Sequence, residues 1–314
     1  MKGQYGRIFR TLLPFVAIIG LFIVFTAVNP RFASMTNLFN ITRQSSVLIV
    51  VALAGTFIIL QGSIDLSVGS MVTLAGILSS ILILNVGAPA IILVPIVGLV
   101  AGLFNGVLFA YGKLPSFLVT LGTLFVFNGA SLYISKGHPQ PFKAPGMETV
   151  VNGSLIGGFP NLGLIALVVY GLCVFVAFRT KFGRYMFSIG GGERVAKLSG
   201  VPVNFYKFLA FGVSGFLAAL GGLMLASRIS AGAPNMGEPY LLDSIAAVVI
   251  GGTALSGGVG GPHRTILGAL VIAILSNGMN ILNVYPFTQI IIRGLVVIVA
   301  VALTMDRSKI ELMK

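Results

Sequence analysis

The sequence is poor in charged residues. Only 9% of its 314 residues are Asp, Glu, Lys or Arg, while 56% are hydrophobic and the mean hydropathy is +1.03. Soluble domains average about a quarter charged residues, so this composition cannot supply a water-facing surface for a globular protein of this length. We therefore predict an integral membrane protein that resides in a lipid bilayer.

Cysteine and the common metal and nucleotide motifs are also scarce. The single cysteine, Cys173, excludes an internal disulfide and a cysteine-rich metal site. There is no H-E-x-x-H zinc motif. The nearest approach to a Walker A loop, GVLFAYGKL at 106–114, has the wrong spacing and a Leu where Ser or Thr must hold magnesium. We expect no metal, no cofactor and no ATP bound by this chain itself.

One short segment matches an enzyme motif. G-V-S-G at 212–215 fits the G-x-S-G of intramembrane serine proteases, with Ser214 as the nucleophile and His263 as its potential base. A tetrapeptide of this kind carries little information in a chain with 41 glycines. We predict that the protein is not an enzyme.

Ten apolar runs have about the 20 residues that a membrane-spanning helix needs, and helices satisfy their backbone groups without water. The first run exceeds a usual signal-peptide core of about 7 to 15 residues, and no A-x-A cleavage triplet follows it. The alternating pattern of an outer-membrane barrel is absent. The predicted fold is all-α, one polytopic transmembrane domain over 1–314, with spans at about 12–28, 45–61, 67–84, 90–110, 115–132, 162–178, 204–227, 243–258, 264–282 and 287–304.

The charges that are present are mainly basic, 20 Lys and Arg against 7 Asp and Glu, for a net charge of +13. They are too dispersed between apolar runs to form a nucleic-acid groove, so we expect no nucleic-acid partner. The positive-inside rule favours ten spans with both termini in the cytoplasm. The inner side then receives Lys2, Arg7, Arg10, Lys113, Arg179, Lys181, Arg184, Arg194, Lys197, Lys207, Arg264, Arg307, Lys309 and Lys314. The outer side receives Arg31, Arg43, Lys136, Lys143 and Arg228, and Arg293 falls within the last span.

Two hydrophilic loops and two interrupted helices stand out. The loops are an outer stretch at 133–161 and an inner stretch at 179–207, and neither has room for a soluble catalytic domain. The second and eighth spans are short and are followed by Gly/Ser-rich breaks, QGSIDLSVGS at 61–70 and GGTALSGGVGG at 251–261. Such breaks are tolerated at membrane depth only where they are buried in protein or line a wet cavity. We predict that both breaks belong to a solute pathway.

Two acidic residues adjoin these segments. A carboxylate amid apolar helices, such as Asp65, indicates a functional site, either as a hydrogen-bond acceptor for a polyol or as a proton site. Asp65 is also well placed to cap a helix starting near Leu66, and the two roles are compatible. Asp243 has the same two possible roles, and we favour that of N-cap of the eighth span, with Glu238 as plain outer-surface charge.

Polar side chains inside the spans are few and mostly neutral. Amides suit the hydroxyl-rich face of a sugar, although each also serves as a hydrogen bond between helices. As a set they favour a neutral polar solute over an ion. The predicted pathway residues are Gln61, Asp65, Ser67, Asn105, Asn128, Asn277 and Asn280.

Glycine spacing predicts one close helix contact. Gly98, Gly102 and Gly106 form G-x-x-x-G-x-x-x-G in the fourth span. This spacing leaves one helix face without side chains, so that a neighbouring backbone can approach closely.

The inner stretch contains a candidate docking helix. Glu193 to Ser199 is flanked by glycines at 190–192 and 200, which predicts a short helix along the membrane face with Val195, Ala196 and Leu198 available for docking. The alternative is a solvated loop anchored by positive charge.

Three strings together carry a resemblance to a known family. SIDLSVGS at 63–70, the F-G-R…I-G-G-x-E-x-x-A-x-x-S-G segment at 182–200, and GEPYLLDSIAAVVIGGTALSGGVGG at 237–261 resemble the permease subunits of bacterial ABC importers for monosaccharides. This is the ribose, galactose and xylose class, related to branched-chain amino acid permeases. The chain departs from the family pattern at Gly192, usually Asn, at Val195, often Ala, and at Gly62-Ser63, usually Gly-Gly.

The resemblance implies partners and roles. It implies a bacterial inner-membrane permease that forms a dimer, most simply a homodimer, around a translocation path for a ribose-like sugar. A cytoplasmic ABC ATPase would bind ATP and drive transport, and a periplasmic or lipid-anchored sugar-binding protein would deliver the solute. The implied coupling residues are Gly183, Gly190, Glu193, Arg194, Ala196 and Gly200. Binding-protein docking would use Arg31, Arg43, Lys136, Lys143 and Arg228.

A secondary transporter is the alternative from a different class. Asp65 would then be a proton or cation site for coupled uptake of a small polar solute. The sequence does not distinguish ribose from other pentoses, hexoses, nucleosides or related polyols.

Overall fold

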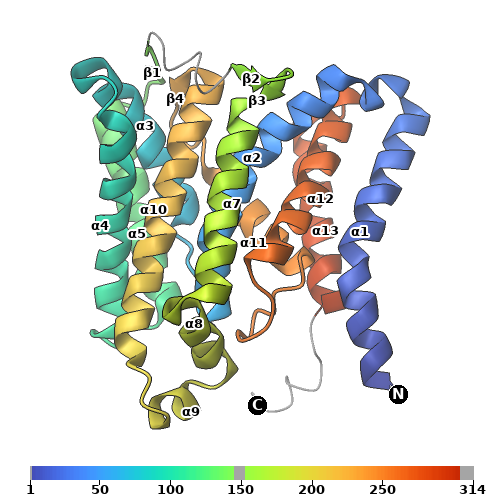
Figure 1. Ribbon diagram of the computed structural model, residues 1–314. Helices are drawn as coiled ribbons and strands as arrows, with labels where there is room; N and C mark the ends of the chain where they lie inside the picture. Colours follow the sequence, from blue (N-terminus) through green and yellow to red (C-terminus); the bar gives the residue numbers. More distant parts are fainter. Residues whose placement is uncertain (1, 145–152, 305–314) are drawn as a thin grey trace.

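The computed structural model describes residues 2–144 and 153–304, which form a bundle of long helices (Figure 1). The helices are α1 (Lys2–Val28), η1 (Pro30–Ala33), α2 (Met35–Leu60), α3 (Val68–Val86), α4 (Ala90–Ala110), α5 (Ser116–Ser135), α7 (Asn161–Arg179), α8 (Lys181–Gly191), α9 (Glu193–Leu198), α10 (Val203–Ile229), α11 (Glu238–Ile250), α12 (Pro262–Ile281) and α13 (Pro286–Thr304). The short strands are β1 (Gln140–Pro141), β2 (Ser154–Ile156), β3 (Phe159–Pro160) and β4 (Ala231–Gly232), paired antiparallel as β1–β4 and β2–β3.

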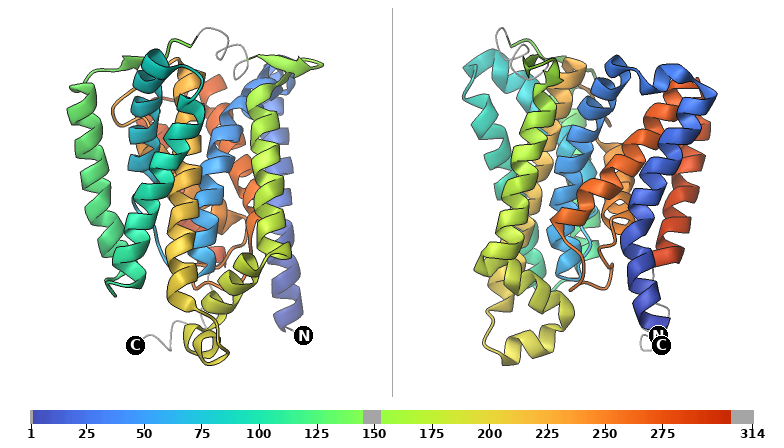
Figure 2. Two further views of the ribbon diagram at one scale, coloured as in Figure 1. Left: turned by 60° about the vertical axis from the view of Figure 1, so that its left-hand side comes forward. Right: turned by 45° about the vertical axis from the view of Figure 1, so that its right-hand side comes forward.

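The bundle has two distinct ends. The strands lie at one end and α8 and α9 at the other, and we call these the strand end and the α9 end (Figure 1). The beginning of α1 and the last turn of α13 both lie toward the α9 end (Figure 2). An even number of crossings brings both terminal helices to the same end. Part of the predicted outer loop, residues 145–152, lies outside the described residues.

Each predicted span overlaps a helix, and the all-α multi-pass prediction is confirmed. Seven helices of the described chain, α2, α3, α4, α5, α7, α10 and α12, are long and apolar enough to cross a membrane. α1 and α13 contribute shorter apolar stretches, Leu12–Val28 and Pro286–Val299. α2 starts ten residues before its predicted span because Ser34 caps it, accepting the backbone N–H of Asn37 at 3.3 Å.

The eighth crossing differs from its predicted boundaries. α11 begins at Glu238 and ends at Ile250, so residues 251–258 form a loop and not the end of a span. Its 13 residues make about 20 Å of helix, less than the roughly 30 Å of a bilayer core. Gly252, Gly257 and Gly258 in the loop have positive φ, a conformation that favours glycine and ends the helix.

The glycine-spaced face of the fourth span packs as predicted. A Cβ at Gly102 would lie 2.1 Å from the carbonyl oxygen of Phe211 in α10, and one at Gly98 would lie 2.4 Å from that of Gly215. Only bare backbone permits this approach. α4 and α10 are therefore held at close range by their glycines.

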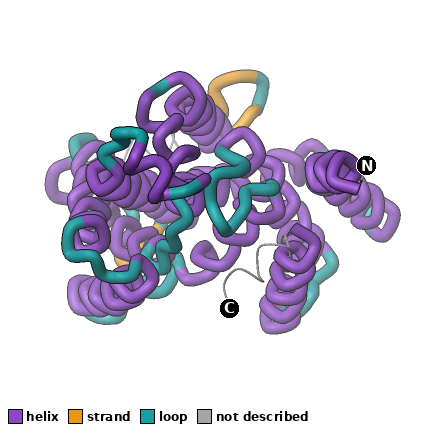
Figure 3. The backbone as a smooth tube through the Cα atoms, turned by 90° about the horizontal axis from the view of Figure 1, so that it is seen from below, coloured by secondary structure: helices purple, strands orange, loops and turns teal. Residues whose placement is uncertain are grey.

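Helices differ sharply in burial. α2 lies inside the bundle, with 89% of an 18-residue apolar stretch buried. α1 lies at the edge of the bundle when it is viewed from the α9 end (Figure 3). α13 exposes large apolar side chains, among them Ile291, Leu295 and Ile298. Such exposed apolar faces are suited to contact with lipid.

Candidate functional site

The loop between α2 and α3, residues 61–67, carries a buried carboxylate. Asp65 is only 8% exposed. Its Oδ1 accepts the backbone N–H of Ser67 at 2.9 Å and the Ser67 hydroxyl at 2.6 Å. Its Oδ2 accepts the hydroxyl of Ser214 in α10 at 2.9 Å. Hydrogen bonds to an ionised acceptor are the stronger kind, so these three neutral donors favour the ionised form of the carboxylate.

The cluster around Asp65 reaches two further helices. Nδ2 of Asn105, in α4, donates to the Ser67 hydroxyl at 3.0 Å. The backbone N–H of Leu66 donates to Oγ1 of Thr120 in α5 at 3.0 Å. The break between α2 and α3 is thus held by side chains of α4, α5 and α10.

The structure corrects the predicted capping role of Asp65. α3 begins at Val68 with Ser67 as its N-cap residue, and the Ser67 side chain makes no capping bond. The N–H that Asp65 accepts belongs to Ser67, which precedes the helix. Asp65 therefore forms a local Asx-type turn and a bond between elements, not a helix cap.

Ser214 belongs to this cluster, although the sequence pattern around it matched a protease. It is fully buried and donates to Asp65. Its neighbour Gly215 packs on α4. The imidazole of His263, the base that proteolysis requires, stacks edge-on to Phe178 at 5.0 Å between centroids. The G-x-S-G segment therefore serves helix packing and the Asp65 cluster.

Two buried amides beside the loop have unused hydrogen-bonding capacity. Gln61 is 4% exposed, and neither its Nε2 nor its Oε1 has a hydrogen-bond partner. Asn105 is 1% exposed, and its Oδ1 is likewise unpartnered. Buried polar atoms without partners cost about 1–3 kcal/mol each. Three of the predicted pathway residues, Asp65, Ser67 and Asn105, are hydrogen-bonded together, and Gln61 is the first residue of the same loop.

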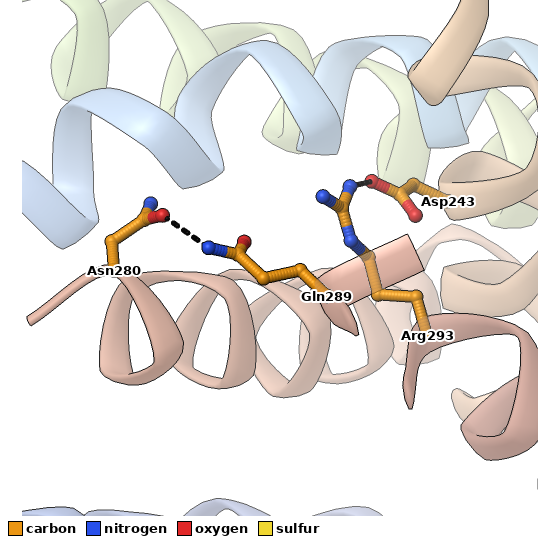
Figure 4. A network of polar contacts seen from close by, with 4 residues as sticks. All are labelled: Asp243, Asn280, Gln289 and Arg293. Carbon is orange, nitrogen blue, oxygen red and sulfur yellow. Dashed lines mark hydrogen bonds and ion pairs between the residues drawn. The ribbon is translucent and has the colours of Figure 1, made fainter. Parts of the chain in front are cut away.

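The other predicted pathway residues lie apart from this cluster. Asn128 in α5 and Asn277 in α12 each have a buried, unpartnered oxygen. Oδ1 of Asn280, near the end of α12, accepts Nε2 of Gln289 in α13 at 2.9 Å (Figure 4). Within the described chain, no hydrogen bond joins these three to Asp65.

A second carboxylate lies in α11 and is ion-paired. Nη1 of Arg293 donates to Oδ2 of Asp243 at 3.1 Å, with side chains 23% and 15% exposed (Figure 4). The prediction that Asp243 is the N-cap of the eighth span is wrong, because α11 begins five residues earlier, after Gly237. Gln289 and Arg293 lie one turn apart, so one face of α13 contacts both α12 and α11.

The inner stretch at 179–207 contacts the chain at both interrupted helices, where α2 ends and in the 251–261 loop. The backbone N–H of Gly258 donates to the carbonyl oxygen of Leu60 at 2.9 Å. A Cβ at Gly190 in α8 would lie 1.8 Å from that same oxygen and 2.4 Å from the Gly258 nitrogen. We call this contact of Leu60, Gly190 and Gly258 the glycine junction. It joins α8 directly to the end of α2 and to the 251–261 loop.

Comparison with known proteins identifies the family. A family model described as "Branched-chain amino acid transport system / permease component" matches residues 37–301. The chain belongs to this permease family. It is 37% identical to the ribose import permease protein of Haemophilus influenzae, covering 95% of this chain and 94% of the relative. It is 38% identical to the ribose import permease protein of Bacillus subtilis, covering 98% and 95%.

More distant relatives include other transport permeases. The xylose transport system permease protein of Haemophilus influenzae is 32% identical, covering 98% of this chain and 99% of the relative. No solved structure matches the chain. The family resemblance expected from the sequence is thus confirmed, as is the expectation that this permease is not itself an enzyme.

The predicted docking helix of the permease exists as α9. Ala196 is buried, while Val195 and Leu198 are 68% and 82% exposed. Oε2 of Glu193 pairs with Nζ of Lys207 at 2.6 Å within the chain. The side chains of Val195 and Leu198 are therefore free to contact a partner protein, whereas Glu193 is already ion-paired within its own chain.

Two of the remaining predicted coupling residues, Gly183 and Gly200, determine the turns that bound α8 and α9. A Cβ at Gly183 would lie 2.0 Å from the carbonyl oxygen of Ala177, which requires glycine at the turn from α7 to α8. Gly200 has φ +79°, where glycine is favoured, and its N–H donates to the Lys197 carbonyl. Arg194 is exposed on α9.

The predicted outer basic residues of the permease divide into two groups. Arg31, Lys136 and Lys143 are exposed at the strand end. Arg43 is half-buried within α2, and half-buried Arg228 lies beside the Tyr240 hydroxyl. The first group is open to a partner, whereas Arg228 faces another part of its own chain.

Proposed function

We propose that this permease is the membrane subunit of an ATP-driven, binding-protein-dependent importer of a monosaccharide, with a ribose-like sugar favoured. The observation that carries the proposal is 37–38% identity to two proteins named ribose import permease, over at least 94% of their length. The buried amides and hydroxyls support a neutral polyol, because they both donate and accept. Because one relative is named as a xylose transport permease, other pentoses are also candidate solutes.

ATP coupling is assigned to the α9 end. The basic residues near α8 and α9 support a cytoplasmic location for this end and for both termini. We expect an ABC ATPase to bind ATP and to seat α9 through Val195, Leu198 and Arg194, all exposed. The glycine junction would carry the movement of α8 to both interrupted helices.

The other partners follow from the same proposal. A second copy of the permease would complete the translocation path. A periplasmic or lipid-anchored sugar-binding protein would dock at the strand end, where Arg31, Lys136 and Lys143 would attract carboxylates on its surface. Gln61, Asp65, Ser67 and Asn105 are the proposed solute-contacting group near the breaks.

Transport in proteoliposomes tests the proposal. The permease, its ATPase and the binding protein should take up labelled ribose only when ATP is present, and an uncoupler should have no effect. Val195→Asp with Leu198→Asp should reduce uptake at least tenfold, since both charges enter the ATPase contact. Leu114→Asp is the matched control, because Leu114 is 49% exposed in the loop between α4 and α5 at the same end.

The alternative, a secondary transporter using Asp65, predicts the opposite results. The supporting observation is that this buried carboxylate has three neutral donors and no cationic partner among the described residues. Uptake would then need no ATP and would stop with an uncoupler. ATP-dependent uptake that persists in Asp65→Asn would exclude it.

A further inference from the structure

α11 begins inside the membrane domain. The backbone N–H of Gly237 donates to Oγ1 of Thr73 in α3 at 2.9 Å, and a Cβ at Gly237 would lie 2.1 Å from the carbonyl oxygen of Gly69. Thr73 is separated from Val86, at the strand end of α3, by about 20 Å of helix. The views agree, since α11 lies at middle height in the bundle (Figures 1 and 2). The start of α11 is therefore far from the membrane surface.

One face of α11 is open at this depth. Glu238 and Pro239 are exposed, and Leu242, one turn later, is 63% exposed. The face opposite is in the core, where Ala247 and Val248 are fully buried. Since Asp243 faces α13 through Arg293, the open face is turned toward neither α13 nor the core.

The carboxylate on this face has no ionic partner among the described residues. The ion pairs within the described residues are Lys207–Glu193 and Arg293–Asp243, and neither includes Glu238. An ionised side chain at membrane depth is costly in hydrocarbon, so such residues face water or a pairing group. The outer-surface position expected for Glu238 from the sequence does not hold.

We propose that the face of α11 formed by Glu238, Pro239 and Leu242 lines the aqueous translocation path, and that the Glu238 carboxylate accepts hydrogen bonds from the hydroxyls of a passing polyol. The inference rests on the proposed transport function for its solute but not for the exposure of this face to water. A carboxylate beside an apolar surface suits a sugar, which presents hydroxyls at its edge and C–H groups on its face.

Thiol labelling of the assembled transporter tests the water-filled surroundings. Cys173→Ala removes the only cysteine, which is buried in α7. In this background Glu238→Cys and Leu242→Cys report on the path, and Leu295→Cys is the matched control on the apolar face of α13. Thiols react as thiolates, which need water. A membrane-impermeant methanethiosulfonate is applied to right-side-out and inside-out vesicles, with and without ATP.

The two path reporters should react at least tenfold faster than Leu295→Cys in one vesicle orientation, and ribose should slow them. Equal, slow labelling of all three variants from both sides would overturn the proposal. Leu242→Cys keeps the test valid if Glu238→Cys fails to accumulate in the membrane.

Uptake kinetics test the acceptor role separately. Glu238→Leu should raise the KM for ribose about tenfold, while Glu238→Gln, which keeps one acceptor oxygen, should raise it less than threefold. An unchanged KM in Glu238→Leu, at equal amounts of membrane protein, would overturn the acceptor role. If the unmodified complex does not transport ribose at all, the proposed function fails, whereas the labelling experiment still decides the path.

Discussion

Asp65 and Asp243 are both carboxylates inside the membrane domain, but they are stabilised in different ways. Asp65 accepts three hydrogen bonds from neutral serine groups in its own loop and α10. Asp243 has a single cationic partner, Arg293, from a helix 50 residues further along the chain. Neutral donors bring no opposite charge to Asp65, whereas Arg293 brings one to Asp243.

This difference determines how strongly a substitution at each site affects stability. Removing one donor from Asp65 leaves two others in place. Removing either member of the Asp243–Arg293 pair leaves an uncompensated charge in a poorly solvated site, which costs far more than the pair itself contributes. We therefore expect stability to fall in small steps as the donors to Asp65 are removed one by one. Removal of either member of the Asp243–Arg293 pair should give the full loss at once.

The largest effect is expected from breaking the ion pair on one side. Arg293→Leu should lower the free energy of unfolding by about 3 kcal/mol, because it leaves Asp243 unpaired. Thermal unfolding of the purified protein in detergent measures the loss. The double variant Asp243→Leu with Arg293→Leu should recover most of it. If the single and the double variant are equally unstable, the charge pairing is not the cause.

Deleting the Asp65 carboxylate should have the next largest effect. Asp65→Ala leaves the Ser67 N–H and two hydroxyls without their acceptor, at a cost of about 2–3 kcal/mol after relaxation. The same unfolding assay applies. Asn85→Ala is the control, since Asn85 is exposed and its amide bonds only to the backbone oxygen of Ile81 in its own helix, so its change is expected to stay within about 0.5 kcal/mol.

Neutralising each acid without changing its shape makes the comparison sharper. Asp65→Asn keeps one acceptor oxygen and should cost about 1 kcal/mol, while Asp243→Asn keeps an acceptor for Arg293 but removes its countercharge and should cost about 2 kcal/mol. The ratio of the two losses is the measured quantity. Equal losses would mean that Arg293 finds another partner or reaches water.

The smallest effect is expected from removing a single donor. Ser214→Ala should cost about 1 kcal/mol, because Asp65 keeps its two bonds from Ser67. Ser131→Ala is the matched control, since the buried Ser131 hydroxyl bonds only to the backbone oxygen of Phe127 in its own helix. No loss in Ser214→Ala beyond that of Ser131→Ala would remove Ser214 from the cluster.

Features governed by local sequence were predictable. Apolar runs of the right length located the helices, and the spacing of Gly98, Gly102 and Gly106 indicated a close contact because helix periodicity places them on one face. The short helix α9 was recognisable from its flanking glycines. These properties depend on residues a few positions apart.

Features that depend on distant residues were not predictable from one sequence. Ser214 contacts Asp65 across 149 positions, and its own neighbourhood carries only a glycine pattern that also fits a protease. Asp243 looked like a helix cap because an apolar run follows it, but Pro239 supplies a good first-turn residue and the helix starts earlier. The sequence predicts Glu238 to be surface charge, because no local pattern indicates how deeply the chain re-enters the membrane domain after α10.

The separation of Asp243 from Arg293 along the chain has a consequence for biosynthesis. α11 is too short to cross the bilayer alone, and its charge has no counterpart until α13 has left the ribosome. α11 therefore cannot settle in its final position as it is made, and the last helix completes the insertion of one that preceded it. A chain arrested between α12 and α13 would leave the Asp243 carboxylate without Arg293.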